Sequence, residues 1–200
     1  MTKLLLIRHA TTNSVGKRLS GRTPGVLLNE EGEAQARQLA QRLSHLPISA
    51  IYSSPLERTR QTADFLAQAQ GLQTSIDEAF LELNFGDWTN LVFEELSGNA
   101  EFQRFNTFRS FTRIPGGEMM LEAQARFMAG LQKLCAKHPH ETVAVVSHSD
   151  LIKAAVAYYA GIPLDMFQRL EISPASVSII EVYEETARIL LINDTGELQP

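Results

Sequence analysis

The chain has 200 residues, of which 44% are hydrophobic, so it can bury a sizeable core within one domain. Its net charge of -5 at pH 7 argues against nucleic acid or an anionic membrane as the main partner, because both require a basic surface. The single cysteine, Cys135, excludes an internal disulfide and predicts a buried structural thiol in a reducing, cytoplasmic setting. The apolar run after Lys3 is too short for a signal peptide or a membrane span, so we expect a soluble, unprocessed protein.

The elements expected along the chain alternate between strands and helices. Continuous apolar runs predict strands covered on both faces, and an apolar residue every three or four positions predicts a helix. In chain order we expect a strand at 4–7, a loop at 11–28, a helix from Asn29 to Pro47, a strand at 48–54, a helix from Ser54 to Gly71, a short strand at 73–77 and a structured loop at 81–88. After these we expect a helical insertion at about 89–114, a helix that ends before Pro139, a strand from Val143 towards His148, a further helix, and two strands joined by a turn at 184–186.

The starts of two helices have specific candidate caps. Ser54 is expected as an N-cap, with Pro55 at the first helical position and Glu57 completing a capping box. The helix after His148 has three candidate caps, Ser147, Ser149 and Asp150.

Strands that alternate with helices predict an α/β fold, a three-layer α/β/α sandwich with a mostly parallel central sheet and a small helical insertion. We expect residues 1–200 to form a single domain. The phenylalanines of the insertion are expected to anchor it to the body of the domain, and a lid over the substrate is the alternative. Trp88 is expected to pack close to the loop at 81–88.

Two histidines follow predicted strands from opposite ends of the chain. His9 and His148 should therefore lie at the carboxyl edge of the sheet, where open α/β sheets bind ligands. Arg8 adjoins His9, and Arg58, in the first turn of its helix, can approach an anion held by the free N–H groups of the helix start. Taken singly, each histidine could be satisfied by its own backbone, and Arg58 could form a surface salt bridge. Together, the four residues indicate a site for an anion.

Several motifs then resemble one known family. The stretch RHATTNSVGKRLSG is similar to the R-H-G-x-T opening of the histidine phosphatase superfamily, the phosphoglycerate mutase-like proteins, with Ala10 in place of the glycine. SSPLERTRQTA resembles that family's second arginine motif, LELNFGDW the acidic motif of its phosphatase and mutase branch, and PGGE followed by VSHS its later landmarks. These motifs occur in family order from residue 4 to about residue 150.

The resemblance implies a role for each of five residues. His9 would be the nucleophile, Arg8 and Arg58 would bind the phosphate, Glu82 would donate a proton, and His148 would stabilise the transferred phosphoryl group. Paired arginines also lower the pKa of a neighbouring histidine, which keeps a ring nitrogen unprotonated for attack. Burial would raise the pKa of Glu82 whereas the arginines would lower it, and the sequence leaves that balance open.

Other residues are expected to complete the pocket. By resemblance, the substrate-binding residues are Arg8, Arg58, Asn13, Ser20, Gly21, Arg18 and Ser149, and Arg22 adds positive charge. A solvated loop is an equal alternative for Arg18. Ala10 and Ser149 stand where the family has a glycine after each histidine, and we expect a negative φ at both, because neither tolerates a positive φ well.

These features predict a metal-independent phosphatase that hydrolyses a small phosphomonoester through a phosphohistidine intermediate, with no cofactor. A phosphoglycerate-type phosphomutase is the alternative. Because larger mutases of the family carry a longer insertion and tail, the short end of this chain at 196–200 favours hydrolysis. The expected partner is a small phosphorylated metabolite, with a homodimer also open.

Two further alternatives are weaker. A binding module without turnover would need the arginines but neither a nucleophile nor an acid. A zinc hydrolase is disfavoured because the arginines would repel the cation, and no H-E-x-x-H or paired-cysteine spacing is present. The leaving group stays open among sugar phosphates, phosphoglycerates, nucleotide-derived phosphates and phosphoprotein.

Overall fold

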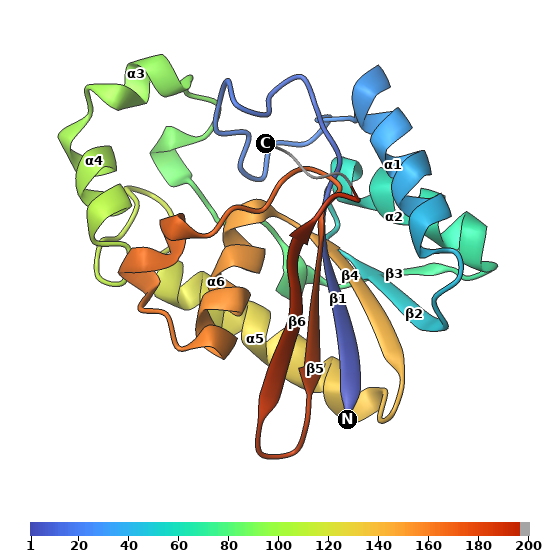
Figure 1. Cartoon of the computed structure of the whole chain (residues 1–200). Coiled ribbons are helices and arrows are strands. Elements are labelled where there is room, and N and C mark those ends of the chain that lie inside the picture. The colour runs from blue at the N-terminus through green and yellow to red at the C-terminus, as the bar shows by residue number, and fades with distance from the viewer. Residues whose placement is uncertain (197–200) are drawn as a thin grey trace.

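The computed structural model describes residues 1–196 and contains a six-stranded sheet between two layers of helices (Figure 1). The strands are β1 (Thr2–Arg8), β2 (Ile48–Ser53), β3 (Thr74–Ile76), β4 (Thr142–Ser147), β5 (Val177–Val182) and β6 (Ala187–Asp194). Their order is β3-β2-β4-β1-β5-β6, with β1 to β4 mutually parallel, β5 antiparallel to β1, and β6 antiparallel to β5. The expected α/β sandwich with a mostly parallel sheet is confirmed.

Helices cover both faces of the sheet. They are α1 (Glu30–Leu43), α2 (Glu57–Gln70), α3 (Phe93–Ser97), α4 (Ala100–Thr107), α5 (Met120–Lys137) and α6 (Ser149–Ala160), together with the short 3-10 helices η1 (Glu78–Phe80), η2 (Gly86–Trp88) and η3 (Leu164–Arg169). Helices α3 and α4 lie within the segment expected to form the insertion. In Figure 1 this segment stands apart from the sheet, near the loop that follows β1.

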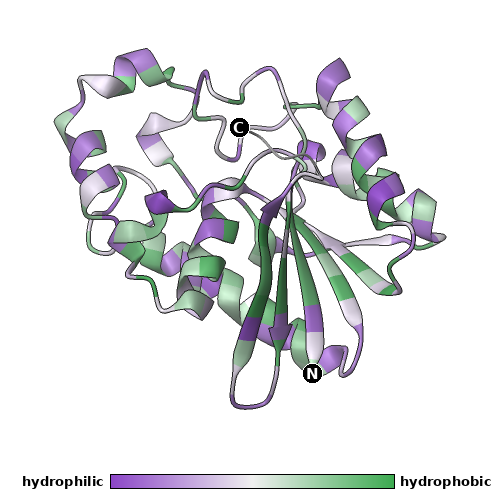
Figure 2. Ribbon diagram, in the orientation of Figure 1, coloured by the Kyte–Doolittle hydropathy of each residue, from purple (hydrophilic) through white to green (hydrophobic). Residues whose placement is uncertain are grey.

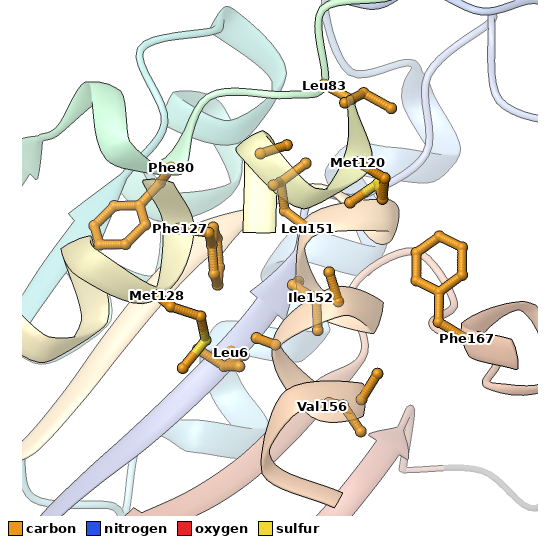
Figure 3. Packing of buried hydrophobic residues seen from close by; sticks show 14 of the residues in the cluster. Leu6, Phe80, Leu83, Met120, Phe127, Met128, Leu151, Ile152, Val156 and Phe167 are labelled. Atoms are coloured by element: carbon orange, nitrogen blue, oxygen red, sulfur yellow. The ribbon is translucent and has the colours of Figure 1, made fainter. Parts of the chain in front are cut away.

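The unbroken apolar run of β1 is explained by burial on both faces. Leu5 and Ile7 pack with residues of α1 and α2, whereas Leu4 and Leu6 pack with residues of α5 and α6. This burial is visible in Figure 2, where the strands are mostly hydrophobic and the helices carry both hydrophilic and hydrophobic residues. On the second face, Leu6 lies among side chains of α5 and α6, including Met128 (Figure 3). A rigid, doubly covered strand therefore carries Arg8 and His9 to the sheet edge.

The starts of α1 and α2 differ in how well the sequence predicts them. Asn29 caps α1 as expected, because its side chain accepts a hydrogen bond from the backbone N–H of Gly32 at 2.8 Å. The capping box expected from Ser54 is wrong, since α2 begins at Glu57 and its N-cap is Leu56. The reason is that Ser54 still extends the sheet, its N–H donating to the carbonyl of Val146 at 3.0 Å.

The caps expected for α6 are also wrong. His148 is the N-cap of α6, in an extended conformation, and its side chain makes no capping hydrogen bond. Ser147 is still paired with Arg8 of β1, and its hydroxyl donates to the carbonyl of Phe80 at 2.8 Å. Ser149 and Asp150 already belong to the helix. The abrupt change from strand to helix at His148 leaves its imidazole free for other partners.

The insertion is anchored by some of its phenylalanines and not by others. Phe105 is fully buried, and its ring and that of Phe102 lie 5.5 and 5.4 Å from the ring of Trp88, edge to face. Phe108 and Phe111 stack on each other but are 43% and 74% exposed. Anchoring is therefore confirmed for Phe102 and Phe105, as is the packing role of Trp88, which is buried.

Several other expectations can be compared with the structure. Cys135 is half-buried rather than buried, and burial raises the pKa of its thiol. The turn expected at 184–186 lies between β5 and β6.

Within residues 1–196, no helix combines the length and the apolar character needed to cross a membrane. Residues 197–200, on which the argument from the short chain end partly rests, lie outside the described part of the chain.

Candidate active site

The two predicted histidines lie side by side at one edge of the sheet. Strands β1 and β4 are parallel neighbours in which Arg8 is level with Ser147, and the N–H of His9 donates to the carbonyl of Ser147 at 3.0 Å. The ring centroids of His9 and His148 are 5.4 Å apart. Parallel pairing of the two strands therefore joins residues that are far apart in the sequence.

A cavity of about 210 Å³ opens beside His9. Eight of the predicted site residues line it, namely Arg8, His9, Arg18, Ser20, Gly21, Arg58, Glu82 and Ser149. His148 is fully buried and is not part of the lining. Asn13 is not brought to the cavity either, because its side chain is exposed and accepts a hydrogen bond from Asn29 at 3.2 Å.

The two arginines are held by backbone carbonyls and keep unused donors. Arg8 donates from Nη1 to the carbonyl of Ile172 at 2.6 Å, and Arg58 donates from Nη2 to the carbonyl of Gly21 at 2.8 Å. Nε of Arg8 and Nη1 of Arg58 are buried without a hydrogen-bond partner. Buried donors are normally paired, so an anion between the two guanidinium groups would supply the missing acceptors. Burial lowers the pKa of both groups, but a guanidinium stays charged in proteins.

The tautomer of His9 follows from its neighbour. Nδ1 lies 2.8 Å from the carbonyl oxygen of Ala10, which can only accept a hydrogen bond, so Nδ1 carries the proton. Nε2 is then the unprotonated nitrogen. Burial, followed by the charges of Arg58 and Arg8, holds the pKa of His9 well below its usual value. The ring is therefore neutral near pH 7 and has a free lone pair, as a nucleophile requires.

His148 is held in a different way. Its Nε2 lies 2.9 Å from the hydroxyl of Ser54, and its Nδ1 lies 3.4 Å from Nη2 of Arg58 and 3.5 Å from Oε2 of Glu82. Burial and the charge of Arg58 hold its pKa well below the usual value. Because Arg58 can only donate, the neutral ring accepts at Nδ1 and donates from Nε2 to Ser54. This histidine therefore connects Arg58 to Glu82.

Burial decides the balance that the sequence left open at Glu82. One carboxylate oxygen accepts the N–H of Leu83 at 2.8 Å, and this bond and the charges of Arg58 and Arg8 favour ionisation. Burial, reinforced by the negative charge of Asp150, outweighs them and raises the pKa of Glu82 to about 7. A carboxyl with such a pKa is substantially protonated at neutral pH, so it can donate a proton to a leaving oxygen.

The loop that carries Glu82 is fixed from behind by Glu118 of the PGGE motif. One carboxylate oxygen of Glu118 accepts the N–H of Asn84 at 2.9 Å, and the other pairs with Nη2 of Arg22 at 2.8 Å. Arg22 in turn donates from Nε to the carbonyl of Glu82 at 2.8 Å, and Arg126 pairs with Glu118 at 3.3 Å. The expectation that Arg22 adds charge to the pocket is thus wrong, because its charge is used to hold this loop.

Gly117 of the PGGE motif and Gly86 of the LELNFGDW motif allow these two segments to approach each other closely. A Cβ on Gly117 would lie 2.3 Å from the carbonyl oxygen of Asn84, and one on Gly86 would lie 2.1 Å from that of Pro115. Both distances are shorter than any real contact of a Cβ atom. The two segments therefore pack backbone to backbone, and a side chain at either position would displace the loop that carries Glu82.

Ala10 and Ser149 fit the site without glycine. Neither is among the four non-glycine residues that have a positive φ in residues 1–196, so the expected negative φ is confirmed for both. Ser149 donates weakly to the carbonyl of Ile172 at 3.4 Å, the same carbonyl that holds Arg8.

Sequence reasoning missed several residues of the cavity. Its lining also includes Asp150, Phe85, Phe93, Thr12, Ser14, Val15, Gly16 and Leu19. Asp150 directly follows the VSHS motif, and that position was a signal that it reaches the site, although it was considered only as a helix cap. Within residues 1–196, no three His, Cys, Asp or Glu side chains form a group that could hold a metal ion.

Comparisons with known proteins agree with this geometry. Over 202 residues, the chain is 33% identical to phosphoserine phosphatase 1 of Hydrogenobacter thermophilus, covering 99% of this chain and 95% of that protein. It is 30% identical over 184 residues to the probable phosphoglycerate mutase GpmB of Erwinia tasmaniensis, covering 90% and 85% of the two chains. The structure of phosphoserine phosphatase from Entamoeba histolytica in complex with 3-phosphoglyceric acid superposes with a TM-score of 0.87 at 26% identity, covering 97% of this chain and 98% of that one. Residues 4–195 match the model of the histidine phosphatase superfamily (branch 1), and the chain belongs to this family.

Proposed function

We propose that this enzyme of the histidine phosphatase family is a metal-independent phosphatase that hydrolyses a small phosphomonoester through phospho-His9. The observation that carries the proposal is the free Nε2 of His9 in a cavity that also holds two arginines with unused donors. A phosphate monoester is a small dianion, and its transfer is catalysed mostly by positioning and charge stabilisation. The site offers both, together with a protonated carboxyl.

The chemistry divides into two steps. In the first, Arg8 and Arg58 hold the phosphate, Nε2 of His9 forms a bond to phosphorus, and the P–O bond to the alcohol breaks as Glu82 gives its proton to the departing oxygen. In the second, Glu82 takes a proton from water as the water oxygen attacks phosphorus and the P–N bond breaks. His148 orients Arg58 and Glu82 in both steps. Its direct contact with the phosphoryl group stays a prediction.

The names of the relatives support this class of substrate and keep the mutase as the second candidate. One relative is named a phosphoserine phosphatase and another a probable phosphoglycerate mutase, and both names imply small phosphorylated metabolites. We propose residues 1–200 as a single catalytic domain with a helical insertion at about 89–114. The cytoplasmic setting and the homodimer stay predictions.

A rapid-quench experiment with a ³²P-labelled phosphomonoester tests the proposal. We expect label on His9 that is labile in acid and stable in base, together with steady release of phosphate and no loss of activity in a chelator. Stable label without release to water would favour the mutase. Activity lost in the chelator and restored by a metal would overturn the metal-independent mechanism, and no label and no turnover with any ester would favour a binding module.

A further inference from the structure

Asp150 is an acidic residue of the catalytic cavity to which the proposed mechanism gives no role. It occupies the first turn of α6, two residues after His148, and its side chain is 20% exposed. Among the described residues that line the cavity, Asp150 and Glu82 are the acidic ones. Because Glu82 must be protonated to act, Asp150 supplies the fixed negative charge on the cavity wall.

The carboxylate of Asp150 is held in one position by the insertion. Nη1 of Arg109, which follows α4, donates to Oδ2 of Asp150 at 3.0 Å. The guanidinium of Arg109 is itself buried between the rings of Phe105 and Phe167, at 4.4 and 4.7 Å from their centroids, and donates to Asn106 at 2.6 Å. Such packing fixes the arginine, and the arginine in turn holds the carboxylate of Asp150 at the cavity wall.

Pairing with Arg109 does not remove the negative charge from the site. The charge of Asp150 is one of the causes that raise the pKa of Glu82, and it also acts on Arg8. No hydrogen bond to Oδ1 of Asp150 comes from any residue in the range 1–196. One oxygen of a carboxylate held by a guanidinium is therefore available to a cationic donor, and charge-assisted hydrogen bonds are the strong ones.

We propose that Asp150 is a specificity-determining residue that binds an ammonium group on the alcohol portion of the substrate. The substrate class is then a small phosphomonoester that also carries an amine, such as an O-phosphoamino acid. Arg18 lines the same cavity and offers a cation for a carboxylate of that substrate. The inference rests on the proposed function, because it assigns the leaving alcohol of the same reaction.

Three esters that differ at one carbon test the inference. O-phosphoserine, 3-phosphoglycerate and 3-hydroxypropionate 3-phosphate carry an ammonium, a hydroxyl and a hydrogen at carbon 2, with the same carboxylate and phosphate. We expect kcat/KM for phosphoserine to exceed that for each of the other two by roughly tenfold or more. In Asp150→Asn, we expect the ratio of the phosphoserine value to the 3-hydroxypropionate 3-phosphate value to fall by about that factor, because a change in the pKa of Glu82 affects both esters alike.

Asp165→Asn is the matched control. Asp165 accepts hydrogen bonds from the N–H of Ser110 at 2.7 Å and from its hydroxyl at 2.8 Å, so it ties down the residue next to Arg109. It does not line the cavity. The control therefore loosens the same anchor of the insertion without removing the carboxylate from the cavity. Ratios between substrates are read within one preparation, so a partly unfolded variant does not alter them.

The outcomes separate this inference from the proposed function. A phosphoserine preference that disappears in Asp150→Asn and persists in Asp165→Asn supports the inference. Equal rates with the three esters, or a preference unchanged in Asp150→Asn, would overturn it while leaving the phosphatase intact, provided that p-nitrophenyl phosphate still labels His9. Absence of label and turnover with every ester would overturn both.

Discussion

The ends of β1 and β4 carry histidines in equivalent positions with opposite hydrogen-bonding patterns. His9 uses Nδ1 to donate to a carbonyl oxygen and leaves Nε2 to the cavity. His148 has Nε2 against the hydroxyl of Ser54 and Nδ1 against Arg58 and Glu82. The strands determine where the two rings are, but the neighbouring atoms determine which nitrogen can react. One ring is thus suited to attack and the other to organise.

The largest expected effects come from replacing each of the two histidines in turn. We expect His9→Asn to abolish phosphoenzyme formation and to lower turnover by about 10³-fold or more, because the attacking atom is lost. His148→Asn should slow labelling by about 10²-fold, a loss typical of one positioning or stabilising group, while the label still forms on His9. Rapid-quench labelling with peptide mapping measures both.

His45→Asn is the control, since His45 is exposed and lies outside the cavity. It should match the unsubstituted protein in rate and label. Label found on His148 in the unsubstituted protein would reverse the two assignments, and equal residual label in His9→Asn and His148→Asn would show that the hydrogen-bonding pattern does not separate the roles.

The ionisation of Glu82 tests the role of His148 as well, because a carboxylate oxygen of Glu82 lies 3.5 Å from Nδ1 of His148. With a pKa of about 7, the carboxyl is protonated below that pH and ionised above it, so turnover of an alkyl phosphate should decline above about pH 7. Glu82→Gln should remove this limb and lower the alkyl ester rate by about 10²-fold or more, with a smaller loss for p-nitrophenyl phosphate, whose leaving group needs no proton.

The measurement is the pH profile of kcat with both esters. An unchanged alkaline limb in Glu82→Gln would assign the proton donor to another group. Glu118→Gln is a useful companion, because Glu118 holds the loop from behind and should lower the rate without removing the limb.

The sequence predicts those parts of the site that follow from the local pattern of a single strand. Apolar runs identify β1 and β4 because both faces of these strands are buried, and the residue after each strand then falls at the sheet edge. The motifs SSPLERTRQTA and LELNFGDW assign Arg58 and Glu82 to the site through their resemblance to those of a family. The closeness of His9 and His148 followed from parallel pairing, which the alternation of strands and helices already favoured.

The parts that the sequence did not predict depend on side-chain partners far along the chain. Ser54 has the right spacing for a helix cap, yet its N–H donates to the carbonyl of Val146 in β4 and its hydroxyl lies against His148. Arg22 has the right charge for the pocket, yet Glu118 and the carbonyl of Glu82 hold it elsewhere. Asp150 lines the cavity with its carboxylate paired to Arg109 of the insertion, a partner 41 residues away. No local pattern encodes such pairs.

The smallest expected effect of the two histidines is on the free energy of unfolding rather than on the reaction rate. Both histidines have a pKa held well below 6.5 in the folded protein, so below that pH the unfolded chain binds more protons and the free energy of unfolding decreases as pH falls. Each ring contributes a loss that approaches about 1.4 kcal/mol per pH unit as the pH falls well below 6.5.

Glu82 acts in the opposite direction in the same pH range. Its pKa is raised from 4.5 to about 7, so the folded protein binds the extra proton, and this group gains stability as pH falls from 7 towards 4.5. Because the two histidines lose stability and the one carboxyl gains it, the free energy of unfolding of the whole protein decreases as pH falls. In His148→Asn the remaining ring and the carboxyl should nearly cancel, so urea unfolding between pH 6.5 and 5.5 should show a dependence weaker by about 1 kcal/mol than in the unsubstituted protein or His45→Asn. An equally steep dependence in His148→Asn would mean that His148 is protonated in the folded state, and the hydrogen bond that it donates to Ser54 would then no longer identify Nδ1 as an acceptor.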